Sequence, residues 1–187
     1  PGAIPLELFV MTELGMAISN PLVPGSRRAG AVGLPLPTVE ARLVDEHGTD
    51  STHGPAEVWI RGPSVFAGYF GQEEATRAAF TDGWFRTGDV AVIESGAYRL
   101  LGRSSVDILK TGGEKVSALE IEEVLREHAD VAEVAVVGVA DPTWGDRVVA
   151  FVAWRSNEID QPADAPSRTD ALRSWAKERL PPFKVPK

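Results

Sequence analysis

Cysteine is absent from the 187-residue sequence, and histidine occurs only three times. Without cysteine the protein has no disulfide bond, no catalytic thiolate and no cysteine ligand for a metal, and we expect a cytoplasmic protein. The histidines do not have the spacing of metal ligands. No apolar run reaches the roughly 20 residues of a membrane helix, so we expect no membrane span.

Positive charge is also scarce, because 19 Lys and Arg stand against 27 Asp and Glu and the formal net charge is −8. An acidic surface repels a phosphate backbone, which argues against a nucleic-acid partner. The remaining composition, 43% hydrophobic and 25% charged, is that of a globular protein. The length allows one or two domains with a real core, and nothing in it indicates an oligomeric state.

The chain up to Arg103 reads as short strands separated by glycine turns. Apolar and polar residues alternate in several runs, and Asp82-Gly83 is a typical hairpin turn. We expect a small twisted sheet or partial β-barrel. The predicted elements are strands at 39–44, 56–61 and 97–101, and a helix at 73–80.

After Arg103 the pattern changes to longer elements. Ser117 and Glu120 form a capping box ahead of an amphipathic stripe that extends to His128. The predicted order is a helix at 117–128, strands at 131–139 and 148–154, a polar loop at 157–167, and a helix from Thr169 that ends at Pro181. This is a compact α+β unit. We therefore divide the chain into a β-rich domain, 1–103, and a small C-terminal domain, 104–187.

Thr12 and Glu13 place a hydroxyl beside a carboxylate. Hard oxygen ligands suit Mg²⁺, and a hydroxyl can bond a phosphate oxygen, so the pair suits a magnesium–phosphate site. An exposed turn is the alternative, and it is the commoner meaning of so short a pattern.

Asp89 follows Thr87-Gly88 at a predicted strand start. A carboxylate there can accept two hydrogen bonds from a vicinal diol such as a ribose, each worth roughly 1.5–3 kcal/mol. The alternative is a hairpin in which the aspartate caps its own backbone.

Two further segments offer groups for anions and close backbone approach. In 102–116, Arg103 can meet an anion or a diol, and Gly112-Gly113 permits positive φ next to a ligand; an ordinary interdomain linker is the alternative. In 180–187, an aromatic ring stands beside two lysines, which suits a stacked base and phosphates. A solvated tail is the alternative there.

In this order and spacing the segments resemble the adenylate-forming superfamily of acyl-CoA synthetases, firefly luciferase and peptide-synthetase adenylation domains. The match extends from about Leu6 to Lys187. Residues 102–120, together with 140–145, look most like malonyl-CoA and methylmalonyl-CoA synthetases. The resemblance implies the end of a large AMP-binding domain joined by a hinge to a small mobile C-terminal domain, an α/β fold of α+β character.

The resemblance also implies residue roles in the first domain. Thr12 would bind ATP phosphates and Glu13 would ligate Mg²⁺, while Asp89 and Arg103 would hold the ribose. Phe9 stands where the family has a tyrosine stacked on adenine, and the next residue is valine instead of glycine. Because malonate carries a second carboxylate, we expect a cationic partner in the acyl pocket. Our candidate is Arg28, with a solvent-facing arginine as the alternative.

In the second domain the resemblance implies a coenzyme A site. The loop 110–115 would swing toward the acyl-adenylate, glycines and a tryptophan would line the pantetheine tunnel, and the C-terminal segment would meet the adenine and phosphates of CoA. The residues given these roles are Lys110, Gly112, Gly113, Trp144, Phe183, Lys184 and Lys187.

The family reaction has two steps: a carboxylate and Mg·ATP give acyl-AMP and pyrophosphate, and the CoA thiol then displaces AMP. The family's phosphate loop and its adenylation lysine are expected outside this sequence, which looks like the C-terminal portion of a synthetase. We therefore expect part of an acid–thiol ligase that uses ATP, Mg²⁺ and CoA, inactive by itself. The alternatives are a broader acyl- or aryl-CoA ligase and a truncated, non-catalytic nucleotide- or CoA-binding module.

Overall fold

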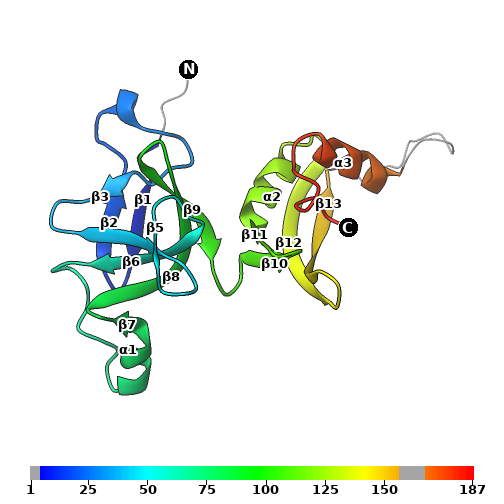
Figure 1. Ribbon diagram of the computed structural model, residues 1–187. Helices are drawn as coiled ribbons and strands as arrows, with labels where there is room; N and C mark the ends of the chain where they lie inside the picture. Colours follow the sequence, from blue (N-terminus) through cyan, green and yellow to red (C-terminus); the bar gives the residue numbers. More distant parts are fainter. Residues whose placement is uncertain (1–4, 156–166) are drawn as a thin grey trace. The chain divides into compact units, whose positions relative to one another are not determined.

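The computed structural model describes residues 5–155 and 167–187. The chain folds as two compact units, Pro1–Ser104 and Ser105–Lys187, whose elements are labelled in Figure 1. The division falls one residue after the boundary proposed from the sequence. The predicted loop at 157–167 lies, except for Ser167, outside the described residues.

From residue 5 on, the first unit is built from antiparallel strands with one α-helix. Its strands are β1 (Leu8–Met11), β2 (Gly15–Ser19), β3 (Leu34–Pro35), β4 (Glu40–Val44), β5 (Asp50–Ser51), β6 (Ala56–Arg61), β7 (Phe80–Thr81), β8 (Trp84–Glu94) and β9 (Ala97–Arg103), with α1 (Glu73–Ala79) before β7 and a 3-10 turn, η1, at Pro24–Ser26. A three-stranded sheet has the order β1-β2-β3. A second sheet has the order β5-β4-β6-β8-β7, with β9 on β8.

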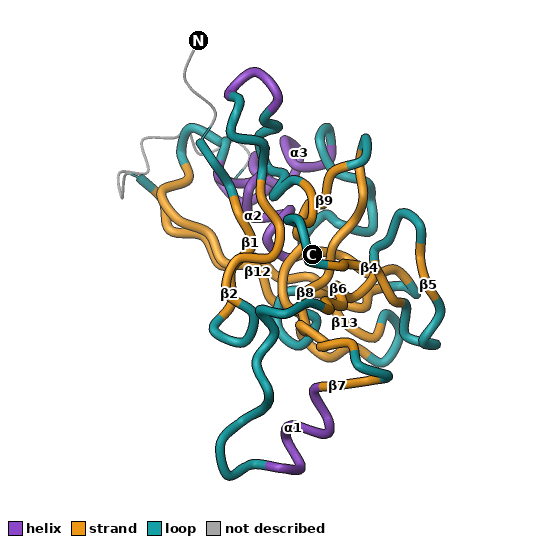
Figure 2. The backbone as a smooth tube through the Cα atoms, turned by 90° about the vertical axis from the view of Figure 1, so that its left-hand side faces the viewer, coloured by secondary structure: helices purple, strands orange, loops and turns teal. Residues whose placement is uncertain are grey.

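The sheets of this unit curl around a shared core, which gives the expected half-barrel (Figure 1). Tyr98 in β9 exchanges backbone hydrogen bonds with the segment that leads into β3, at Val32 and Gly33. The core draws on both sheets, because Ile18 of β2 and Phe85 of β8 belong to one buried cluster. Figure 2 shows α1 and β7 at one end of the unit.

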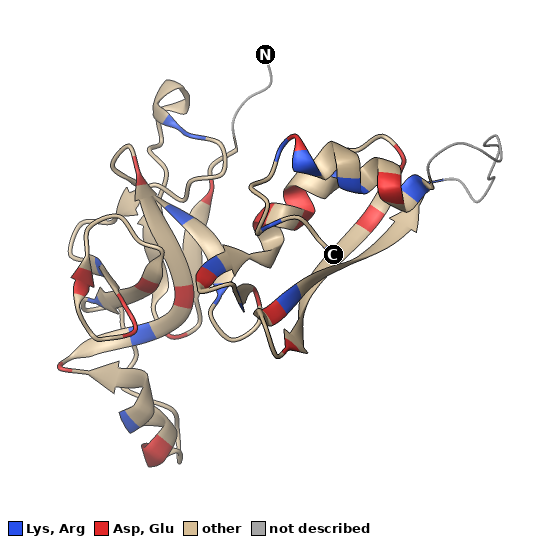
Figure 3. Ribbon diagram, turned by 45° about the vertical axis from the view of Figure 1, so that its right-hand side comes forward, with Lys and Arg blue, Asp and Glu red and all other residues tan. Residues whose placement is uncertain are grey.

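In its described residues, 105–155 and 167–187, the second unit is a four-stranded antiparallel sheet with two helices. Its elements are β10 (Ile108–Thr111), β11 (Glu114–Ser117), α2 (Ala118–Arg126), β12 (Val131–Asp141), β13 (Gly145–Trp154) and α3 (Arg168–Lys177), and the strand order is β11-β10-β13-β12. Ile121 and Leu125 of α2 and Ala176 of α3 are buried in its core. In the view of Figure 3, acidic and basic residues are interspersed along these helices. No helix in the described part of the chain is long and apolar enough to cross a membrane.

Several boundaries differ from the predictions. The first helix ends at Ala79, and Phe80 pairs with Phe85 in the β7–β8 hairpin, because Asp82-Gly83 turns the chain with positive φ at both positions. The α2 helix ends at Arg126, so His128 lies beyond it, with its ring edge-on to Trp175.

A larger difference concerns residues 108–117, which were not predicted to form strands. Residues 108–117 form the β10–β11 hairpin, in which Lys110 pairs with Lys115. Gly112 and Gly113 are its two-residue turn, with φ of 59° and 86°. A two-residue turn with positive φ at both positions matches the natural twist of paired strands. The positive φ that the sequence allowed at Gly112-Gly113 is thus confirmed, and the glycines specify a hairpin that was not predicted.

Candidate active site

Glu13 lies in the tight turn between β1 and β2. Met11 pairs with Gly15 across this turn, and Leu14 is fully buried beneath it. The burial of Leu14 fixes the turn on the core, so that Thr12 and Glu13 are held at the surface. Thr12 is exposed and Glu13 is half-buried.

Three groups surround the Glu13 carboxylate. The Thr12 hydroxyl donates to one oxygen at 2.7 Å, and the Tyr69 hydroxyl donates to the other at 3.2 Å. The Thr12 hydrogen bond is the main reason that the pKa of Glu13 is lowered from its ordinary value. The Tyr69 hydroxyl and the positive charge of Arg103 act in the same direction, and burial opposes them. Glu13 is therefore a well-stabilised anion at neutral pH.

Asp89 lies inside β8, not at a strand start as predicted. Its backbone N–H donates to the Thr87 hydroxyl at 3.1 Å, and that hydroxyl donates to the Val58 carbonyl at 2.7 Å. The register of β6 against β8 shifts at this place, between Glu57 and Trp59. A bulge of this kind re-aims side chains within a strand. The Asp89 side chain is only 12% exposed.

Arg103 interacts with both acidic residues proposed for the site in the first unit, Glu13 and Asp89. It pairs with Asp89 across β8 and β9, and its Nε lies 3.1 Å from Asp89 Oδ1. Its charge also acts on Glu13 and on Tyr69. The structure thus brings together four residues that the sequence selected from three separate segments, namely Thr12, Glu13, Asp89 and Arg103.

Two other residues of this unit that the sequence analysis proposed for the site, Phe9 and Arg28, do not join these four. Phe9 is 5% exposed and belongs to the hydrophobic core, so its ring offers no face to a base. The expected adenine platform at Phe9 is therefore a misassignment, caused by strand alternation that turns Val10 outward and Phe9 inward. Arg28 lies exposed in the 20–30 loop. Its neighbour Arg27 is half-buried and donates to the carbonyls of Pro21 and Leu22.

In the second unit the β10–β11 turn meets the turn between β12 and β13. The Gly112 N–H donates to the Trp144 carbonyl at 2.9 Å, and the Lys110 N–H donates to Asp146 at 2.8 Å. A side chain at Gly112 would come within 3.3 Å of the Trp144 ring. The Lys187 ammonium lies 5.1 Å from the centre of that ring, within cation–π range. Lys110, Gly112, Trp144 and Lys187 therefore form one cluster, and Gly113 is the second residue of the β10–β11 turn in this cluster.

The remaining two selected residues differ in their surroundings. Phe183 is 40% exposed, as a stacking ring would have to be. Lys184 donates to both carboxylate oxygens of Glu120, at 2.7 Å each. Ser117 caps α2 through the Glu120 N–H, as predicted. The Glu120 carboxylate, however, holds the C-terminal segment, a role that the capping box did not indicate.

Tyr69 was missed by the sequence analysis. It lies 56 residues from Glu13, and a Gly-Tyr pair after a strand carries no local sign of a partner. Its pKa is raised, first by burial and then by its bond to Glu13, so its hydroxyl stays protonated and donates at neutral pH. No cluster of three potential His, Cys, Asp or Glu metal ligands occurs among the described residues.

Family models match both units. Residues 3–70 match the AMP-binding enzyme family, and residues 120–187 match the AMP-binding enzyme C-terminal domain. The chain therefore belongs to the AMP-binding enzymes. Asp89, Arg103 and Gly112 lie between the two matched ranges.

The relatives are acid–CoA ligases. The mitochondrial malonate–CoA ligase of Mus musculus is 46% identical over 97% of this chain and 33% of its own length. That of Homo sapiens is 44% identical over 97% of this chain and 34% of its own. Because the names of these two relatives include a mitochondrial location, the expected cytoplasmic location stays a prediction.

Solved structures agree. ATP-bound MatB from Rhodopseudomonas palustris is 36% identical with a TM-score of 0.83, over 97% of this chain and 35% of MatB. The fold is thus that of an adenylate-forming enzyme. The chain spans about a third of the length of the relatives that it matches.

Proposed function

We propose that this chain is part of an AMP-forming acid–thiol ligase, which joins a small carboxylic acid, with malonate favoured, to coenzyme A. The observation that carries the proposal is the convergence of Thr12, Glu13, Asp89 and Arg103 in the first unit. Hydroxyl, carboxylate and guanidinium groups of this kind are what a magnesium nucleotide requires. The names of the relatives and the ATP bound to MatB support the same conclusion.

In the first half-reaction a carboxylate oxygen would attack the α-phosphate of ATP and pyrophosphate would leave. Asp89 would accept hydrogen bonds from the ribose hydroxyls, with Arg103 holding the Asp89 carboxylate in place at 3.1 Å. The Thr12 hydroxyl would bond a phosphate oxygen. Each group acts by positioning the nucleotide and by balancing its charge.

A magnesium ion fits the Glu13 side chain. Magnesium beside nucleotides is usually held by one or two carboxylates together with phosphates and water, so a single glutamate is sufficient. The Thr12 and Tyr69 hydrogen bonds occupy one position on each Glu13 oxygen, and a carboxylate offers about four. Bound there, the ion would neutralise phosphate charge.

In the second half-reaction the CoA thiol would attack the acyl carbonyl and AMP would leave. We assign the CoA-binding surface to the second unit. Gly112 and Gly113 would let the pantetheine chain approach the backbone, beside the half-exposed ring of Trp144. Phe183 would stack on the CoA adenine, and Lys110 and Lys187 would contribute positive charge.

The acid is tested with a panel of carboxylates in a full-length protein that carries this sequence. We expect pyrophosphate release with malonate and methylmalonate to exceed that with butyrate. Arg28→Leu should lower kcat/KM for malonate about tenfold more than for butyrate, because it removes a charge-assisted contact to the second carboxylate. Equal losses on both acids would place Arg28 outside the acyl pocket. Rapid turnover of butyrate or aryl acids would favour the broader ligase, and no turnover the non-catalytic module.

The two C-terminal lysines should respond differently to substitution. Lys184→Ala removes the ion pair with Glu120, in which the lysine side chain is 17% exposed and the glutamate side chain 32% exposed. The substitution should therefore cost about 1–2 kcal/mol of stability. Lys187→Ala should leave the stability nearly unchanged. It should weaken CoA binding several-fold and leave the adenylation half-reaction unaffected. Thermal unfolding and separate assays of the two half-reactions measure these effects. If Lys184→Ala weakens CoA without lowering the melting temperature, Lys184 is a phosphate ligand after all.

A further inference from the structure

Tyr69 comes to Glu13 from a separate segment of the first unit, between β6 and α1. This segment contacts Glu13 at two places. The Phe66 N–H donates to the Glu13 backbone carbonyl at 2.7 Å, and the Tyr69 hydroxyl donates to the Glu13 carboxylate at 3.2 Å. Backbone and side chain of Glu13 are therefore both held by residues 66–69.

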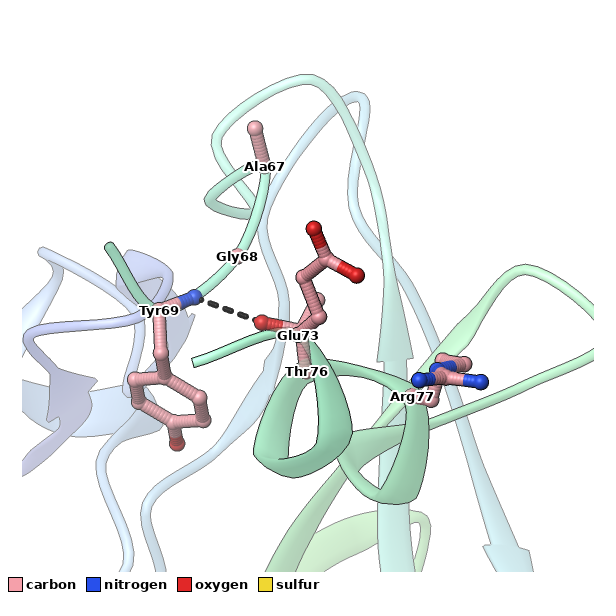
Figure 4. Close-up of a pocket in the computed structure, with 6 residues that line it drawn as sticks. All are labelled: Ala67, Gly68, Tyr69, Glu73, Thr76 and Arg77. Atoms are coloured by element: carbon pink, nitrogen blue, oxygen red, sulfur yellow. Dashed lines mark hydrogen bonds between the residues drawn. The ribbon is translucent and has the colours of Figure 1, made fainter. Parts of the chain in front are cut away.

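The segment itself is firmly fixed. The Tyr69 N–H donates to the Thr76 hydroxyl at 2.9 Å, as drawn in Figure 4, and this hydroxyl in turn donates to the Gln72 carbonyl. The Tyr69 ring meets the Phe66 ring edge-on at 4.8 Å, and the Phe66 ring stacks on Phe80 at 5.7 Å. The Tyr69 hydroxyl is thus presented by a rigid support.

Tyr69 is one of the residues that line the pocket between residues 67–69 and α1, which Figure 4 shows in close-up. The Glu73 carboxylate points toward Ala67 in the same view, on the opposite side from the tyrosine hydroxyl. The Tyr69 hydroxyl donates to Glu13, which is not among the residues that line this pocket.

The two donors to Glu13 are not equivalent. Thr12 is the neighbour of Glu13 in the same turn, so it moves with the glutamate and restricts its orientation little. Tyr69 belongs to a different and rigid segment, and a donor of this kind fixes the direction of the carboxylate. Supporting groups that lock the rotamer of a ligand side chain commonly change metal or substrate affinity.

We propose that Tyr69 is a positioning residue, whose hydroxyl holds the Glu13 carboxylate in the direction that receives the magnesium ion of Mg·ATP. This rests on the proposed function, because it assigns Glu13 to the metal. The atoms that would touch the ion belong to Glu13, and Tyr69 acts only through it. The hydroxyl, and not the ring, carries the role.

The test compares Tyr69→Phe with Tyr98→Phe in a full-length protein that carries this sequence. Both variants lose one hydroxyl and keep the ring, and Tyr98 is a matched control because its hydroxyl donates to the Ala41 carbonyl at 3.1 Å, within the same unit. ATP affinity is measured in excess magnesium and again in EDTA, by calorimetry. Thermal unfolding without nucleotide gives the structural cost of each change.

Tyr69→Phe should weaken ATP binding about tenfold in excess magnesium and less than about twofold in EDTA, as expected for the loss of a hydrogen bond to a charged group. Tyr98→Phe should leave both affinities unchanged. Equal affinities for wild type and Tyr69→Phe in magnesium, with tight magnesium-dependent binding by both, would overturn the role of Tyr69 alone. Equal losses with and without magnesium would show a merely structural role. If the wild type shows no magnesium-dependent binding, the proposed function fails, and this proposal with it.

Discussion

Asp89→Ala should weaken ATP binding by about a hundredfold or more, in a full-length protein that carries this sequence. Two hydrogen bonds from ribose hydroxyls to a carboxylate contribute roughly 1.5–3 kcal/mol each, and every 1.4 kcal/mol is about tenfold in affinity. The substitution also removes the partner of Arg103. Because half of the Arg103 side chain is exposed to water, the stability of the unit should fall by no more than about 1 kcal/mol.

Asp50→Ala is the matched control for Asp89. Asp50 belongs to the same unit and pairs with Arg42 at 3.1 Å, the distance found between Asp89 and Arg103. It should leave ATP affinity unchanged. Equilibrium binding and thermal unfolding measure both variants. An Asp89→Ala protein that melts early but binds ATP normally would show that the aspartate only stabilises its strand.

Gly145→Ala should strongly destabilise the second unit. Gly145 has a φ of 81°, and an added Cβ would lie 2.8 Å from the Lys110 carbonyl oxygen, which belongs to the backbone of β10. Neither strand can yield without breaking the pairing of Thr111 with Gly145. We expect a loss of about 2–4 kcal/mol in stability. Thioester formation should also fall strongly, because Trp144 and Gly112 would be displaced from one another.

Gly113→Ala is the control that has the backbone strain of Gly145→Ala without its steric collision. Gly113 has a φ of 86°, close to that of Gly145, but an added Cβ would meet nothing within 4 Å. It should therefore cost only about 1 kcal/mol. Chemical denaturation of each variant, with CoA affinity measured alongside, gives the comparison. Similar losses for the two glycines would mean that the contact between β10 and β13 is unimportant.

The strands that alternate in the sequence were found where they were predicted. The alternation of residue types located β4 and β6, although consecutive residues are buried in both strands, at Leu43 and Val44 and at 58–60, so that neither strand has one buried and one exposed face along its whole length. The β10–β11 hairpin was not predicted, because two four-residue strands around a pair of glycines are too short to show a periodic pattern. The prediction that Asp89 begins a strand was wrong for a similar reason, because a bulge inside β8 resembles the end of a strand in the local sequence.

For the candidate site, the sequence by itself determined which chemical groups are available and in what order: Thr12-Glu13, Asp89, Arg103, and the glycine pair at 112–113. It did so because short motifs record the residue types that a nucleotide or a thiol ester requires. Only the tertiary structure decided which of these groups meet. Arg103 acts on Glu13, Tyr69 donates to Glu13, and Lys184 is paired with Glu120. Partners separated by 56 or 64 residues are brought together by sheet curvature and core packing, which no local pattern encodes. The same packing turned Phe9 into the core, because a strand that buries one face must point every second side chain inward.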